Sequence, residues 1–256
     1  MTIRVEAIPA LESNYIWMIH NDAVAYLVDP GCANAAEQAL KDHGVALIGI
    51  LVTHHHQDHI GGVDQLIATH NVPVWGPIDE RIQQVTHPVK DGDELILPTL
   101  EIGFRVIATP GHTSTHVAYA NDSMIFAGDT LFSMGCGRLF EGTPAQMQRS
   151  LDRLAELNPH ALVYAGHEYT QSNCAFAMAV EPSNAVTKDR CRVAAELRDH
   201  GQPTLPVILA EELASNPFLR TREPNVVMAA REHDPQCGTT ASEVFATLRA
   251  WKDGAH

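Results

Sequence analysis

A short polar stretch, THHHQDHIGG over residues 53–62, concentrates side chains that bind metal ions. Four histidines and one aspartate occur within six residues: His54, His55, His56, Asp58 and His59. Neutral imidazoles and carboxylates that converge in space are ligands for zinc and related ions. A solvated polar loop would rarely gather so many of them. The stretch therefore predicts a metal site.

The elements on either side of the stretch would aim its side chains at one end of a strand. The preceding run, ALIGILV, is continuously apolar, as expected of a strand buried on both faces. In extended backbone, His54 and His56 project to the same side. Asp58 and His59 then fall on the turn into a helix, GGVDQLIATHN. The histidine between His54 and His56 points away and is not expected to bind.

Three further ligand-type residues follow other predicted strands. His112 lies in ATPGHTSTH, Asp129 in IFAGDT and His167 in VYAGHEYT. Each comes after a β-like run and a glycine, so the three share one context with each other. A single histidine at a strand end is a weak signal, but the repetition predicts that these residues join the same site.

The order of predicted elements indicates an α/β fold. Up to about residue 168, strand-like runs such as AYLVDPG, VPVWG, FRVIATPG and MIFAGD alternate with helical patterns. TPAQMQRSLDRLAEL begins with a capping-box pattern at Thr143 and Gln146. The later helical patterns are linked by proline-containing loops. We expect a catalytic domain over residues 1–168 and a mainly helical domain over residues 169–256.

Composition restricts the possible partners. The chain has 256 residues, 45% of them hydrophobic, which suits one large domain or one domain with a small addition. A formal net charge of −14 disfavours binding to nucleic acid. Apolar runs reach only about seven residues, against roughly 20 for a membrane span. These features predict a protein without membrane or nucleic-acid partners, and we expect a monomer.

Cysteine usage and the first residues indicate the compartment. The five cysteines are widely spaced and contain no Cys-x-x-Cys pattern. We therefore expect reduced cysteines without a disulfide framework. The first 20 residues lack a basic segment followed by an apolar one, so no signal peptide is expected. A cytoplasmic location is the resulting prediction.

These motifs together resemble the metallo-β-lactamase superfamily. The His-x-His-x-Asp-His string is followed in order by PGHT, GDT and GHEYT. More narrowly, the chain resembles glyoxalase II, the hydroxyacylglutathione hydrolases. That match rests on NYIWMI, DPG, GDTLFSMGCGRLFEGT, GHEYTQSNCAFA, NPFLR and LRAWKD, and it covers essentially the whole chain.

The resemblance implies an αββα sandwich with a binuclear metal centre and a small helical C-terminal domain. His54, His56 and His112 would bind one ion, whereas Asp58, His59 and His167 would bind the other. Asp129 would bridge the two. Zinc is favoured, with iron or manganese as alternatives for this nitrogen and oxygen ligand set.

The resemblance also implies a reaction, the hydrolysis of S-(2-hydroxyacyl)glutathione thioesters. A metal-bridging hydroxide would attack the thioester carbonyl, and S-lactoylglutathione would yield glutathione and D-lactate, the second step of methylglyoxal detoxification. Asp58 would orient the nucleophile or take its proton. The implied substrate contacts are Arg138, Phe140, Tyr169, Arg249 and Lys252. Phe140 stands where some members carry tyrosine, so a hydroxyl contact would be missing.

Several alternatives remain open at this level. Other enzymes of the superfamily include lactonases, β-lactamases and persulfide dioxygenases with one iron. A metal-stabilised interaction domain is the non-enzymatic alternative, although structural zinc sites are normally closed. The role of Arg220, the acyl-group preference, the oligomeric state and the metals themselves stay undetermined.

Overall fold

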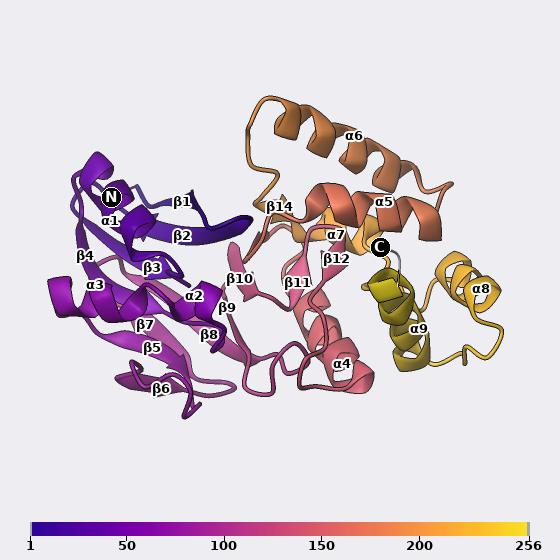
Figure 1. Ribbon diagram of the computed structural model, residues 1–256, viewed down its shortest axis with the longest axis horizontal. Coiled ribbons are helices and arrows are strands. Elements are labelled where there is room, and N and C mark those ends of the chain that lie inside the picture. The colour runs from indigo at the N-terminus through magenta and orange to yellow at the C-terminus, as the bar shows by residue number, and fades with distance from the viewer. Residues whose placement is uncertain (1, 255–256) are drawn as a thin grey trace. The chain divides into compact units, whose positions relative to one another are not determined.

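A computed structural model of the chain describes residues 2–254 (Figure 1). The chain forms two compact units. The first comprises the residues up to Ala108 together with Thr115–Gly128 and Tyr164–Glu168. The second comprises Thr109–Ser114, Asp129–Val163 and the chain from Tyr169 onward. These units divide the chain differently from the predicted boundary at residue 168, which remains a prediction.

One mixed sheet of the first unit carries the histidine stretch. Its strand order is β1-β2-β3-β4-β5-β6. The first three strands are antiparallel and the last four parallel. The bounds are β1 Arg4–Ala10, β2 Asn14–His20, β3 Val24–Val28, β4 Ala46–Leu51, β5 Val74–Pro77 and β6 His87–Val89. The histidine stretch begins two residues after β4, where the sequence placed it.

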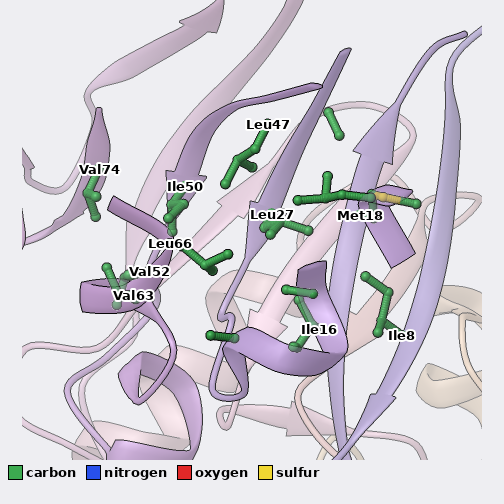
Figure 2. Packing of buried hydrophobic residues seen from close by; sticks show 14 of the residues in the cluster. Ile8, Ile16, Met18, Leu27, Leu47, Ile50, Val52, Val63, Leu66 and Val74 are labelled. Atoms are coloured by element: carbon green, nitrogen blue, oxygen red, sulfur yellow. The ribbon is translucent and has the colours of Figure 1, made fainter. Parts of the chain in front are cut away.

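Helices cover one face of this sheet and enclose an aliphatic core (Figure 2). They are α1 Ala33–His43, α2 Gln57–Ile60 and α3 Val63–His70. Ile16, Met18 and Leu27 from the strands pack with Leu40 of α1 and Leu66 of α3. All five side chains are buried, and burying each stabilises the fold by about 1.5–3 kcal/mol.

A second sheet completes the first unit. The part of this sheet in the first unit runs in the order β13-β10-β9-β8-β7. The bounds of these strands are β7 Glu94–Leu97, β8 Ile102–Ala108, β9 Val117–Ala120, β10 Met124–Gly128 and β13 Leu162–Ala165. The Trp17 indole N–H donates to the Ala165 carbonyl at 2.9 Å, and the Tyr119 hydroxyl donates to the Val52 carbonyl at 2.8 Å. These two bonds link the sheets through buried aromatic rings.

The second unit is mainly helical. Its elements are β11 Leu131–Phe132, β12 Gly135–Cys136, α4 Pro144–Ala155, α5 Thr170–Val180, α6 Ala185–Asp199, β14 Val207–Ile208, α7 Leu209–Ser215, α8 Pro224–His233 and α9 Ala241–Gly254. β14 pairs with β13 at Leu162 and Val163. The predicted capping box is present, because Thr143 and Gln146 each accept the other's backbone N–H. The α/β architecture with a helical C-terminal region is confirmed.

The expectation that every cysteine is reduced is wrong at one pair. Cys174 of α5 and Cys191 of α6 form a disulfide, with their Cα atoms 5.5 Å apart. That separation lies within the range that a disulfide needs. Sequence spacing did not reveal it, because the contact depends on how these two helices pack. Cys32, Cys136 and Cys237 are free thiols.

Among residues 2–254, no helix combines the length and the apolarity that crossing a membrane would require.

Candidate active site

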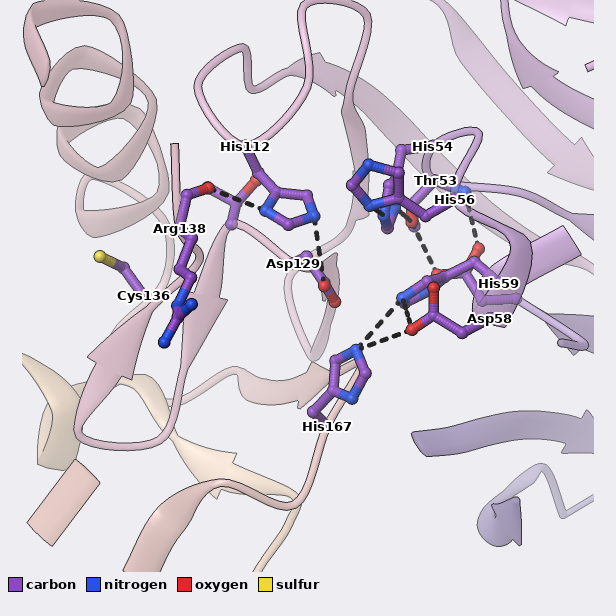
Figure 3. A network of polar contacts seen from close by, with 12 residues as sticks. Thr53, His54, His56, Asp58, His59, His112, Asp129, Cys136, Arg138 and His167 are labelled. Atoms are coloured by element: carbon purple, nitrogen blue, oxygen red, sulfur yellow. Dashed lines mark hydrogen bonds and ion pairs between the residues drawn. The ribbon is translucent and has the colours of Figure 1, made fainter. Parts of the chain in front are cut away.

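Three predicted ligands converge in the first unit (Figure 3). Asp58 Oδ2 lies 3.5 Å from His59 Nε2 and 3.3 Å from His167 Nε2. The two imidazole nitrogens are 3.4 Å apart. Ligand atoms around a tetrahedral zinc ion, with bonds of about 2.0–2.2 Å, are separated by about 3.3 Å. The three atoms therefore have the spacing that one such ion requires.

Hydrogen bonds at the far side of each ring select the tautomer that binds metal. His59 Nδ1 lies 3.0 Å from Asp29 Oδ2 and donates to this buried carboxylate, which leaves the Nε2 lone pair facing Asp58. His167 Nδ1 contacts the Ser13 hydroxyl at 3.0 Å. Partners of this kind orient metal-binding histidines and increase their basicity.

His54 is prepared in the same way. The Thr53 hydroxyl donates to Asp29 Oδ2 at 2.6 Å, so its oxygen accepts from His54 Nδ1 at 3.0 Å. His54 Nε2 then faces His56 Nδ1 at 3.1 Å. Figure 3 shows His54 and His56 together with Thr53. Asp29 thus supports ligands on both sides of the stretch, and it accepts the Thr53 backbone N–H as well, at 2.7 Å.

Asp58 is held in its charged form. Burial alone would raise the pKa of its carboxyl group, but the neighbouring His167 and His59 rings and the hydrogen bond from Asn14 keep the pKa well below its ordinary value. Asn14 Nδ2 donates to both Asp58 Oδ2, at 3.0 Å, and the Asp58 carbonyl, at 3.2 Å. A carboxylate with so low a pKa suits metal binding and orientation of a nucleophile better than acceptance of a proton.

Close backbone approach brings the Asp58 segment to this position. Gly31 follows the β3 strand end, and a Cβ atom there would collide with the Asp58 carbonyl oxygen. Any larger residue at position 31 would push the segment away. The DPG turn thus has two roles. Asp29 supplies the carboxylate that supports the ligands, and Gly31 leaves the space that the Asp58 segment needs.

The second unit contributes another ligand pair. His112 Nε2 lies 3.4 Å from Asp129 Oδ2, and both residues are buried. His112 Nδ1 donates to the Arg138 carbonyl at 2.9 Å, so Nε2 again carries the lone pair. Gly137 permits this arrangement, because a Cβ there would collide with the Asp129 carbonyl oxygen. The close approach of Asp129 thus explains why the GCG stretch has a glycine at position 137.

The chemistry of the donors fits divalent metal ions in each unit. Five ligand-type side chains gather in the first unit and two in the second, and each imidazole with an assigned tautomer has its lone pair on the side of its neighbouring ligands. Buried imidazoles and carboxylates in this arrangement are costly without a cation between them.

Arg249 is committed to the protein itself. Its side chain is buried and donates to the Cys136 carbonyl at 3.0 Å and to Asp253 Oδ1 at 2.9 Å. Its guanidinium also lies over the Phe218 ring, 5.3 Å from the centroid. The structure thus gives Arg249 a supporting position beneath β12. Binding of a substrate carboxylate by Arg249 stays a prediction.

Lys252 lies one helical turn further along α9. Burial, together with the charge of Arg249, lowers its pKa to about 8. Its ammonium group donates to Asn173 Oδ1 and lies over the Phe176 ring, 5.4 Å from the centroid. Burial and the nearby positive charge of Arg249 both disfavour the charged ammonium. Lys252 is therefore a stronger candidate for binding an anionic ligand than a solvated surface lysine.

The remaining predicted substrate contacts also lie in the second unit. The Arg138 side chain is about half exposed and pairs with Asp253 at 3.4 Å. Phe140 is 65% exposed, with its ring 5.2 Å from that of His112. Tyr169 packs edge-on against Phe132, with ring centroids 5.4 Å apart. An exposed phenyl ring beside a proposed ligand is suited to contact a substrate.

Arg220 has a structural position. Its guanidinium forms two hydrogen bonds to the buried Glu181 carboxylate, at 2.7 and 3.1 Å. Glu181 ends α5 and Arg220 follows α7, so the pair joins these helices.

Sequence reasoning missed the residues that support the ligands. They are Ser13, Asn14, Asp29 and Thr53, which lie in turns or at the ends of strands. Asn14 and Asp29 do occur within the NYIWMI and DPG motifs, which was the available signal.

Comparison with known proteins agrees with this architecture. The chain matches the metallo-beta-lactamase superfamily over residues 10–167. A solved structure of ETHE1 from Myxococcus xanthus is 24% identical and covers 100% of both chains, with a TM-score of 0.66. TTHA1623, solved in a di-iron-bound form, is 27% identical, covers 64% of this chain and 91% of its own, and has a TM-score of 0.54. The fold is that of the metallo-beta-lactamase superfamily.

Closer relatives define the family within that fold. Residues 168–255 match the hydroxyacylglutathione hydrolase C-terminus. Hydroxyacylglutathione hydrolases from Cupriavidus metallidurans and Aliivibrio fischeri are each 48% identical to this chain, covering 98% of it and 99% of their own length. The chain belongs to the hydroxyacylglutathione hydrolase family.

Proposed function

We propose that the protein hydrolyses S-(2-hydroxyacyl)glutathione thioesters, with S-lactoylglutathione giving glutathione and D-lactate. The observation that carries this proposal is the 48% identity, along nearly the whole length, to relatives named hydroxyacylglutathione hydrolase. The ligand geometry within each unit supports it, because both groups have the donor chemistry of a metallohydrolase. The reaction would be the second step of methylglyoxal detoxification.

The proposed metal centre uses seven ligands for two divalent ions. His54, His56 and His112 would hold one ion, Asp58, His59 and His167 would hold the other, and Asp129 would be a ligand of both. Fold and ligand clusters together fit binuclear metal binding. Zinc is our first choice, with iron or manganese possible for the same donors. Bound ions would supply an activated water and an electrophile for the thioester carbonyl.

The side chains of the protein supply orientation and recognition. Asp58, fixed by Asn14, orients the nucleophile. Lys252 and Arg249 are proposed to bind a glutathione carboxylate, and Arg138, Phe140 and Tyr169 to contact the rest of the substrate. The leaving group is a thiolate with a pKa near 8.5, so it departs at neutral pH without a strong general acid.

The proposed setting follows from charge and composition. A net charge of −14 argues against nucleic-acid partners, and we propose a cytoplasmic monomer that acts on a small molecule. The catalytic domain over residues 1–168 and the substrate-binding domain over residues 169–256 also remain proposals.

A substrate panel on metal-replete protein tests the activity. Turnover of S-lactoylglutathione should exceed that of a β-lactam, a lactone and a glutathione persulfide by orders of magnitude. Metal analysis should find at least about two ions per chain. A preference for any of the other three substrates would overturn the proposal, and full activity with one ion would overturn the binuclear centre.

A further inference from the structure

A second group of metal-binding side chains lies in the first unit, outside the proposed centre. It consists of Glu6, His20 and His43, whose ligand atoms all lie within 4.8 Å of one another. His20 Nε2 is 3.1 Å from Glu6 Oε1, and His43 Nε2 is 3.1 Å from Glu6 Oε2. None of the three belongs to a motif that the proposed activity uses.

The register of two strands and the end of a helix bring the group together. In the antiparallel pair β1–β2, Arg4 is opposite His20 and Glu6 is opposite Met18. Glu6 and His20 are therefore diagonal neighbours on one face of the sheet. Met18 on that face packs into the core with Leu40 of α1. His43, the last residue of α1, consequently lies over the same strand pair.

The hydrogen bonds of His20 show that its Nε2 is directed at a cation position. Its imidazole is only 2% exposed, and Nδ1 lies 3.0 Å from the Asn21 carbonyl oxygen. A carbonyl can only accept, so Nδ1 carries a proton. In the neutral ring the Nε2 lone pair then faces a carboxylate oxygen, which is repulsive unless a positive charge lies between them. Either a second proton or a metal ion satisfies that requirement.

Two features favour a metal ion over a proton. The distances of 3.1 Å are close to the separation of about 3.3 Å between ligands of a tetrahedral zinc ion. A backbone carbonyl that fixes the opposite nitrogen is the usual support of a metal-binding histidine. His43 also ends α1, where the helix dipole favours a positive charge of either kind.

We propose that Glu6, His20 and His43 bind one further divalent transition-metal ion, with zinc as the best match to two imidazoles and a carboxylate. The buried His20 is the fixed ligand. Glu6 and His43 are about one third exposed and give the ion access from solvent, with water completing the coordination. The ion would join the end of α1 to the β1–β2 pair. It would take no part in thioester hydrolysis, so the proposal is independent of the proposed function.

Equilibrium dialysis of the metal-loaded enzyme against zinc tests this site. Wild type should bind one more ion per chain than either Glu6→Gln or His43→Ala, and thioesterase activity should be equal in all three. The matched control is His70→Ala. His70 pairs with Glu37 at 2.9 Å, but within residues 2–254 this pair belongs to no group of three ligands.

The control should bind zinc like wild type, since it removes an imidazole–carboxylate pair that lacks a third ligand. Loss of one of three ligands should weaken the further ion by at least about tenfold. With cobalt, the wild-type visible spectrum should gain a tetrahedral component that both site variants lack. Equal zinc binding by wild type, Glu6→Gln and His43→Ala would overturn the proposal and leave a protonated ion pair as the explanation.

Discussion

Substitution of Asp29 tests whether its hydrogen bonds fix the tautomers of the proposed histidine ligands. Asp29 is 4% exposed and lies outside the proposed ligand set, yet it accepts three hydrogen bonds from Thr53 and His59. Asp29→Asn keeps the shape of the side chain and removes one acceptor atom. We expect the fold to persist and metal affinity to fall.

The size of the effect follows from where the amide group must lie. If the NH2 group replaces Oδ2, it faces two donors, the Thr53 hydroxyl and His59 Nδ1. His59 can then accept only by moving its proton to Nε2, the atom that faces Asp58. If the amide flips, NH2 instead faces the Thr53 backbone N–H. Changes to such supporting groups cost about 10–100-fold in metal affinity, or about 1.4–2.8 kcal/mol.

The assay is a competition between the protein and a chelator of known affinity, followed by measurement of kcat with excess metal. Asp79→Asn is the matched control. The Asp79 side chain is also buried, but it pairs with Arg81 at 2.7 Å and accepts from Thr115 at 2.5 Å. Within the histidine stretch it contacts His55, at 3.8 Å, which is not a proposed ligand. The control should lose stability and retain metal affinity. Wild-type affinity and turnover in Asp29→Asn would refute the tautomer argument.

Further variants test the ligand set, the recognition of substrate and the stability of the helical region. Asp129→Asn should reduce metal content and lower kcat by orders of magnitude, because an anionic ligand is lost; unchanged turnover at full loading would exclude its role. Lys252→Met should raise KM by at least about tenfold with little change in kcat. In wild type, KM should rise as the pH passes through about 8, since Lys252 loses its charge there, and Lys252→Arg should shift that rise to higher pH. Glu212→Ala should lower the free energy of unfolding by about 3–5 kcal/mol in denaturant titrations, because its buried carboxylate accepts from Ser133, Met134 and Asn216.

The strands that carry the ligands could be predicted because they are apolar runs that end in clear turn signals. β4 and β10 are examples, each followed by a histidine or an aspartate. The β1–β2 pair was not predicted. Its turn includes Leu11 at a φ of 51°, and no glycine, proline or asparagine marks it. A hairpin without such residues has no local sequence signal.

The ligand types could likewise be predicted from sequence, whereas their tautomers could not. Which nitrogen of His59 carries the proton depends on Asp29, which is 30 residues away in the sequence. The tautomer of His112 depends on the backbone carbonyl of Arg138. Every residue has such a carbonyl, so the sequence does not show which one accepts. Such partners are fixed by tertiary packing. The sequence therefore reveals which metals the ligand types suit. It does not reveal which nitrogen of each histidine carries the proton.

The cations of the second unit differ in how far the protein itself satisfies their charge. Arg249 and Arg220 are both bound to internal acceptors, Cys136 and Glu181 respectively. Lys252 differs, because its strongest partner is a neutral amide and burial opposes its charge. A carboxylate arriving beside it would remove that penalty, and the gain would be larger than at a solvated lysine. In a chain with a net charge of −14, a single desolvated ammonium can thus attract an anionic substrate that the rest of the surface repels.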